Sequence, residues 1–152
     1  MILTESDKIW LHERNLFYSK KMGIEAPHLC FSIAEAIDFV GPKQKDRVSH
    51  KYDREHRIYG FASYAVYEGD QNIVAILPKL HVALKGKDEF AKPQRIVKRV
   101  YVYSVSRRLG HCEETLIHEL FHHAHKKHRH GKLFNQKVIA LWENDGTLDP
   151  FL

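Results

Sequence analysis

The sequence contains few of the residues that would place it in several common classes of protein. Its 152 residues include only two cysteines, Cys30 and Cys112, which are far apart and have no partner at C-x-x-C spacing. This excludes a disulfide framework and a cysteine zinc ribbon. No apolar run approaches the roughly 20 residues that cross a membrane, and MILTESDKIW at the start has no basic region followed by an apolar one. We therefore expect a protein of the reducing cytoplasm.

The rest of the composition is that of an ordinary globular protein, with 43% hydrophobic and 28% charged residues. The length fits one domain, residues 1–152, which can bury a single hydrophobic core but not two. The net charge of +5 and the isoelectric point near 9.2 favour anionic partners such as nucleic acid only slightly.

The spacing of apolar residues predicts two helices near the start of the chain. The first begins after Thr4 or Ser6 and ends at Gly23. The second lies in SIAEAIDFVGP, where a capping box opens the helix and a Gly-Pro pair stops it. Residues 42–57, PKQKDRVSHKYDREHR, are so polar and basic that we expect a solvated surface loop that could touch phosphates.

Strands are predicted in the middle of the chain. Aromatic and β-branched residues dominate 57–69, 73–77 is a short buried run, 80–84 follows a proline, and 95–106 alternates. Residues 85–94 have loop composition. We expect three or four antiparallel strands, and hence an α+β fold with a small antiparallel sheet.

The stretch ETLIHELFHHAHKKHRHGKLF, residues 114–134, holds six of the twelve histidines. Apolar residues recur at helical spacing and predict a helix from residue 112 or 113 to about residue 127. Within it, His118, Glu119 and His122 form the H-E-x-x-H pattern. Residues four apart lie side by side on a helix, so two imidazoles can bind one ion. Zinc there would lower the pKa of a bound water, and the carboxylate would take the proton of that water.

A catalytic zinc needs a third protein ligand. His125 is a poor choice because it lies roughly 10 Å along the helix axis from His118, at ~1.5 Å per residue. The chain must turn back, and His128 and His130 both lie where it could do so, just before a helix over KLFNQKVIALWEN. Glu143 is a further alternative, 21 residues after the motif's second histidine, near the spacing of the glutamate ligand in gluzincins.

These residues resemble the SprT-like zinc metallopeptidases, which include the Spartan DNA–protein crosslink proteases. ETLIHELFHH, followed after a short basic loop by HGKLFNQKV, is similar to that family's H-E-x-x-H helix and H-G-x-x-F/W motif. The resemblance implies His118, His122 and His130 as zinc ligands and Glu119 as general base. It also implies a zincin-like fold with N-terminal helices and a closing C-terminal helix, protein or peptide substrates associated with DNA, and a bare catalytic domain without a zinc ribbon.

The residues after His130 also favour it over His128. Gly131 can adopt positive φ and so let the chain turn into the next helix. Phe134, four residues after His130, would pack under the metal-binding helix, whereas Lys132, four residues after His128, belongs in solvent.

Other side chains have weaker claims to a role. His123 and His125 are expected beside the site or in solvent, with His125 able to bond a reaction intermediate, and His81 is expected in the core. Tyr101 and Tyr103 are expected to pack in the sheet, with either able to serve as an oxyanion donor.

A group of cations follows the histidine helix: Lys126, Lys127, Arg129 and Lys132. They could bind DNA phosphates, complement the dipole at the helix end, or do both. Two other functions share these residues: hydrolysis of a non-peptide substrate, and nucleic-acid binding around a structural zinc. Binding to DNA would place the protein at the nucleoid or nucleus.

Overall fold

A computed structural model describes residues 1–85, 93–97, 100–103 and 110–148. It confirms the α+β class, and no helix in these ranges is long and apolar enough to cross a membrane. In chain order the elements are α1 (Glu5–Met22), β1 (His28–Cys30), α2 (Ile33–Phe39), α3 (Pro42–Ser49), the 3-10 helix η1 (His50–Arg57), β2 (Gly60–Ser63), β3 (Ile73–Ile76), the 3-10 helix η2 (Pro78–Leu80), β4 (Pro93–Val97), β5 (Val100–Tyr103), α5 (Cys112–Ala124) and α6 (Lys132–Glu143).

The first two helices begin where the sequence predicts. The Thr4 hydroxyl accepts a hydrogen bond from Asp7 N, and the Asp7 carboxylate accepts one from Thr4 N, which completes a capping box. Gly23 ends α1 in the left-handed conformation, with φ of 73°. Ser32 caps α2 by accepting a hydrogen bond of 3.0 Å from Glu35 N.

The predicted basic loop over residues 42–57 is wrong, because α3 and η1 occupy it. Pro42 stands at the first position of α3, where its missing N–H is not needed. Gln44 and Val48, one turn apart, are the helix's buried residues, and Gln44 donates to Gln71 O at 2.6 Å. Most of the other side chains are exposed. The helix therefore has a narrow buried face, and its largely polar composition resembles that of a loop.

The central sheet is mixed, in the order β1-β3-β2, rather than wholly antiparallel as expected. β1 runs parallel to β3 and β2 antiparallel to it, while β4 and β5 form a separate antiparallel pair. β1 has only three residues, too few for periodicity to reveal. The strand predicted at 80–84 is replaced by η2 and an isolated bridge. Most of the loop predicted at 85–94, and parts of the strand predicted at 95–106, lie outside the described residues.

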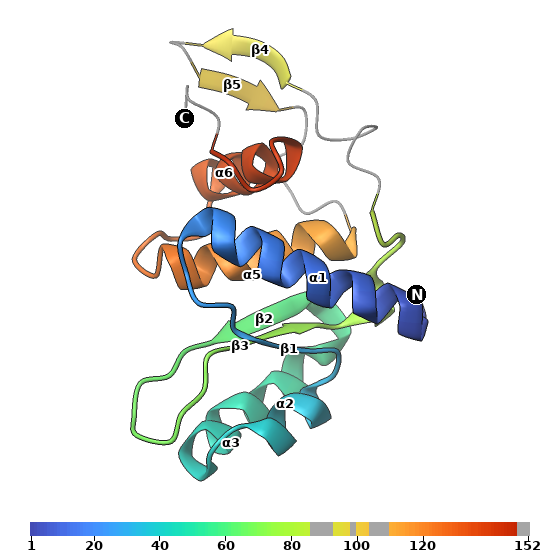
Figure 1. Ribbon diagram of the computed structural model, residues 1–152, viewed down its shortest axis with the longest axis vertical. Helices are drawn as coiled ribbons and strands as arrows, with labels where there is room; N and C mark the ends of the chain where they lie inside the picture. The colour runs from blue at the N-terminus through green and yellow to red at the C-terminus, as the bar shows by residue number, and fades with distance from the viewer. Residues whose placement is uncertain (86–92, 98–99, 104–109, 149–152) are drawn as a thin grey trace.

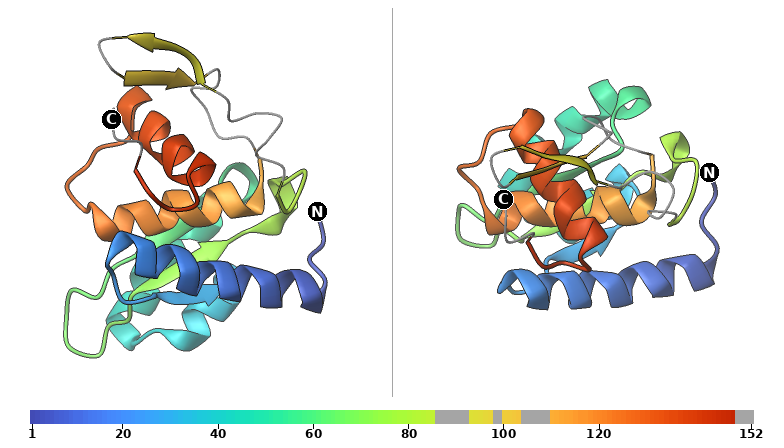
Figure 2. Two further views of the ribbon diagram at one scale, coloured as in Figure 1. Left: turned by 45° about the horizontal axis from the view of Figure 1, so that its top comes forward. Right: turned by 90° about the horizontal axis from the view of Figure 1, so that it is seen from above.

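Both faces of β3 are buried, which explains why its sequence is a continuous apolar run. Val74 and Ile76 join the core formed with α1, α5 and α6, whereas Ile73 and Ala75 join the core formed with α2 and α3. Figure 1 shows the resulting layers: α2 and α3 on one face of the sheet, α1 and α5 on the other, and α6 beyond α5. The second view in Figure 2 shows α6 crossing over α5. α5 is therefore covered on several sides.

Candidate metal centre

The helix that carries the H-E-x-x-H motif is buried over most of its length. Every residue from Cys112 to Phe121 is buried, including His118 and Glu119. The sheet approaches α5 closely at Gly60 of β2, where a Cβ atom would clash with the Ala75 carbonyl oxygen and touch Thr115. A helix enclosed in this way holds its polar side chains in fixed directions.

Three imidazoles converge at the C-terminal half of α5. His130 Nε2 lies 2.7 Å from His122 Nε2 and 3.2 Å from His118 Nε2. Their nitrogens all lie within 4.8 Å of one another, and within the described ranges no other histidines, cysteines or carboxylates form such a group of three. The group, which we call the histidine triad, contains His130 and not His128.

The position of His130 in the triad depends on Gly131 and Phe134, the two residues on which its prediction as third ligand rested. Gly131 has φ of 155° and ψ of −172°, a combination that is essentially restricted to glycine. Phe134 is fully buried, with its ring centroid 5.0 Å from that of His130 and 4.7 Å from that of His118. The glycine thus joins His130 to the start of α6 in an extended conformation that other residues disfavour, and the Phe134 ring packs against the rings of the triad.

The triad fits a metal ion. An ion about 2 Å from each of two imidazole nitrogens, bonded at the tetrahedral angle, holds them about 3.3 Å apart. The separation of 3.2 Å meets this, and the one of 2.7 Å needs only a small widening. Three histidines leave a fourth position open, as catalytic zinc sites do. The residues could therefore hold a metal ion, and the geometry does not identify which one.

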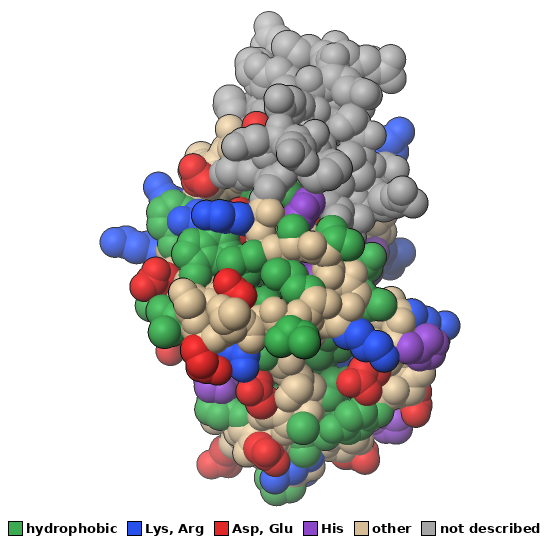
Figure 3. All heavy atoms as spheres, turned by 90° about the vertical axis from the view of Figure 1, so that its right-hand side faces the viewer, with side chains coloured by type: hydrophobic (Ala, Val, Ile, Leu, Met, Phe, Trp, Pro, Cys, Tyr) green, Lys and Arg blue, Asp and Glu red, His purple; other side chains and the backbone are tan. Residues whose placement is uncertain are grey.

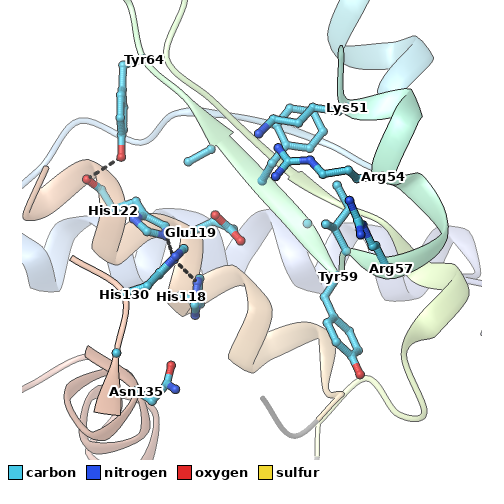
Figure 4. A pocket seen from close by; sticks show the side chains of 15 residues that line it. Lys51, Arg54, Arg57, Tyr59, Tyr64, His118, Glu119, His122, His130 and Asn135 are labelled. Atoms are coloured by element: carbon cyan, nitrogen blue, oxygen red, sulfur yellow. Dashed lines mark hydrogen bonds between the residues drawn. The ribbon is translucent and has the colours of Figure 1, made fainter. Parts of the chain in front are cut away.

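Glu119 lies beside the triad in the same cavity, which has a volume of about 570 Å³ and is walled by β2, η1, α5 and the start of α6. The side chain is only 3% exposed, yet it lines this cavity. Figure 4 shows its carboxylate pointing from α5 into the space between the triad and η1. A carboxylate so placed can accept a proton from a water molecule in the cavity.

Tyr64 is a cavity residue that the sequence analysis did not identify. Its hydroxyl donates a hydrogen bond of 3.2 Å to the carbonyl oxygen of His122, and its ring packs edge-on against His123. Burial raises the pKa of Tyr64, and the Glu119 carboxylate raises it further, so the hydroxyl stays protonated and able to donate. Asn135 of α6 also lines the cavity and was not identified. Neither residue belongs to a motif, so no local signal could have found them.

The other histidines of α5 and its surroundings have different roles. His123 Nε2 bonds the carbonyl oxygen of Ile73 at 2.8 Å and so joins α5 to β3. Burial lowers the pKa of His123, which favours its neutral form. His81 is buried between Leu77 O and the Thr115 hydroxyl, in agreement with a core position.

His125 and His128 stand outside the triad. His125 is exposed and caps the C-terminus of α5, with its ring against Phe121. His128 is half-buried, and its ring packs against Phe121 and Phe134.

The remaining candidates are not brought to the site. Glu143 ends α6, eleven residues after Lys132 at the start of that helix and hence roughly 16 Å along its axis at ~1.5 Å per residue. Tyr101 and Tyr103 lie in β5, and their side chains are outside the described part of the structure. The cations that follow α5 are all exposed: Lys126, Lys127, Arg129 and Lys132.

Comparison with known proteins does not assign the chain to a family. No protein-family model, no curated protein and no solved structure matches the chain.

Proposed function

We propose that this protein is a zinc-dependent metallopeptidase similar to the SprT-like family. One observation carries the proposal: the three Nε2 atoms converge beside the buried Glu119 carboxylate in a single open cavity. A structural zinc would need a fourth ligand and no carboxylate lining an adjacent cavity. The donor set and the space next to it therefore favour catalysis over a structural role.

Zinc bound by the triad would polarise a carbonyl group and lower the pKa of a water molecule toward neutrality. Glu119 would accept the proton of the attacking water and return a proton to the nitrogen of the leaving amine. Glu119 is enclosed by the protein on its other sides, so its carboxylate would meet water and substrate through the cavity. The reaction is the hydrolysis of a peptide bond.

Tyr64 is suited to stabilise the charge that develops on the carbonyl oxygen of the substrate. Its hydroxyl lies at the cavity beside the His122 carbonyl and within electrostatic reach of Glu119. A small rotation of the side chain would turn the O–H from His122 O toward a substrate oxygen. Asn135, on the α6 side of the cavity, could orient the peptide by hydrogen bonds.

The direct test is Glu119→Gln in protein loaded with zinc. The substitution keeps the shape of the side chain but removes the general base, so we expect hydrolysis to fall by about 10²–10⁴-fold. Zinc content and thermal stability should stay close to those of the unchanged protein. Hydrolysis of an unfolded protein substrate at the unchanged rate would exclude this mechanism. A zinc-loaded protein that cleaves an ester but no peptide would favour the hydrolase with a non-peptide substrate.

DNA is proposed as a partner through the exposed cations that follow α5. Lys127, Arg129 and Lys132 all face solvent next to the triad. If they contact phosphates, binding to a short duplex should weaken at least tenfold from low to physiological salt. Replacing all three with glutamine should reduce both the affinity and its salt dependence. Absence of binding at low salt would remove DNA, and with it the location at nucleoid or nucleus, without affecting the peptidase.

A further inference from the structure

Three cationic side chains form one wall of the cavity that contains the histidine triad. Lys51, Arg54 and Arg57 extend from η1 and line this cavity together with Glu119. Figure 4 shows them across the cavity from the triad, with the Glu119 carboxylate between the two groups. We call Lys51, Arg54 and Arg57 the cationic wall.

The cations of the wall form no close ion pair within the described residues, and Glu119 across the cavity offsets part of the charge of Lys51. The ion pairs found there involve other cations, and no carboxylate lies within ion-pairing distance of Lys51, Arg54 or Arg57. Arg47, one turn before Lys51, shows the contrast, since its guanidinium lies 2.7 Å from the Asp70 carboxylate. The cations of the wall thus border the cavity without a close ion-pair partner, whereas Arg47 pairs with Asp70 and stabilises the fold.

Lys51 is the innermost member by burial. It is half-buried, and its ammonium group lies 5.5 Å from the centre of the Phe61 ring. Burial lowers the pKa of Lys51 and nearby Arg54 lowers it further, while the Glu119 carboxylate raises it in part. An anion bound in the cavity would add to the favourable contribution of Glu119.

The cavity as a whole is strongly positive. Glu119 is the one carboxylate among the residues that line it, against the three cations of the wall. A divalent ion on the triad would add to the excess. The face in Figure 3, by comparison, has acidic and basic side chains interspersed over its described part. A concave site of one sign concentrates ligands of the opposite sign.

We propose that the cationic wall is a substrate subsite that selects acidic peptide segments, binding aspartate or glutamate side chains close to the bond that is cleaved. The inference deepens the proposed peptidase function and rests on it for the nature of the reaction. Arginine guanidinium groups bind carboxylates with two parallel hydrogen bonds, so Arg54 and Arg57 suit such side chains. The volume of about 570 Å³ is that of a pocket for a small ligand or a few side chains and not for a duplex.

The test uses zinc-loaded Glu119→Gln protein, so that binding is measured without turnover. One probe is a labelled short peptide of alternating alanine and glutamate, and the other is its twin with glutamine in place of each glutamate. We expect the acidic peptide to bind about tenfold more tightly at low salt, from three partly exposed charge pairs. Combining Lys51→Gln, Arg54→Gln and Arg57→Gln should abolish the preference.

Two further variants make the result specific. Arg54→Gln with Arg57→Gln leaves half-buried Lys51 in place and should remove most of the preference even if the triple variant is unstable. A control with the same loss of charge is Lys20→Gln, Lys45→Gln and Lys79→Gln, which changes exposed lysines that do not line the cavity. The control should keep the full preference.

The outcomes separate this inference from the peptidase proposal. Equal affinity for the two peptides would overturn the acidic subsite, even in a protein that binds zinc and cleaves proteins. Retained preference for the acidic peptide in a protein without zinc or hydrolysis would reject the peptidase and keep the subsite. If the wall variants lose affinity for single-stranded DNA but not for the acidic peptide, the wall is a nucleic-acid site and the proposal is wrong.

Discussion

Polar side chains are buried in both halves of α5, but they contact different kinds of group. At the N-terminal end, Glu113 accepts a hydrogen bond of 2.5 Å from Trp142 Nε1 of α6 and lies 3.4 Å from Arg14 Nε of α1. At the C-terminal end, His118 and His122 direct their Nε2 atoms toward His130 Nε2.

The comparison distinguishes a polar group that stabilises the fold from one arranged for a ligand. The Glu113 carboxylate accepts a hydrogen bond from Trp142 of α6 and forms an ion pair with Arg14 of α1, so it joins α1, α5 and α6. The three imidazole nitrogens of the triad instead lie close enough together to bind one metal ion. The two ends of α5 should therefore respond differently to substitution.

The largest effect is expected from removing both histidines of the motif. His118→Ala combined with His122→Ala leaves His130 as the one remaining triad ligand, which cannot hold the ion alone. Zinc in the purified protein, measured by elemental analysis, should fall from about one per chain to none. Unchanged zinc content in the double variant would show that the metal binds elsewhere.

The next effect separates the two candidates for the third ligand. His130→Ala should weaken zinc binding beyond the ~10–100-fold that loss of an outer partner costs, because it removes a ligand. His128→Ala serves as the matched control and should leave zinc affinity nearly unchanged, since its ring packs against Phe121 and Phe134 and bonds the Arg129 carbonyl oxygen. Competition with a chromogenic chelator measures both, and the reverse result would reassign the ligand.

A substitution at the other end of α5 should change stability without changing the metal. Glu113→Ala leaves Trp142 Nε1 without its acceptor and Arg14 with Asp145 as its remaining ion-pair partner, and we expect a loss of about 3 kcal/mol in the free energy of unfolding. Glu113→Gln keeps an acceptor oxygen for Trp142 and should cost less. Urea denaturation gives the stability, and zinc content under folding conditions should remain about one per chain. Loss of zinc from a folded Glu113→Ala protein would contradict the view that Glu113 stabilises the fold without affecting the metal site.

The smallest effect is expected at Tyr64, which borders the C-terminal end. Tyr64→Phe removes a donor from the cavity, and we expect kcat to fall about 100-fold with little change in KM or zinc affinity. A fall in zinc affinity instead would mean that the hydroxyl acts through His122, by fixing its backbone carbonyl. Equal kcat for both proteins would exclude Tyr64 from the reaction.

The sequence determined the features that depend on neighbouring residues. Thr4, Gly23 and Ser32 mark helix ends because their caps use backbone groups within four residues. The H-E-x-x-H spacing puts two imidazoles and a carboxylate near one another on α5 for the same local reason. Gly131 and Phe134 extended the prediction to His130, because a glycine conformation and a buried ring close to it in sequence fix how the His130 side chain is placed.

The tertiary structure decided what depends on segments far apart in the chain. β1 has three residues, and its parallel pairing with β3 bridges more than 40 positions, so no local pattern could reveal the mixed sheet. The helical nature of residues 42–57 depended on what Gln44 and Val48 are buried against, and not on composition. Tyr64 and the cationic wall border the cavity of the triad because β2 packs on α5 and η1 leads into β2, and such packing follows from the whole core.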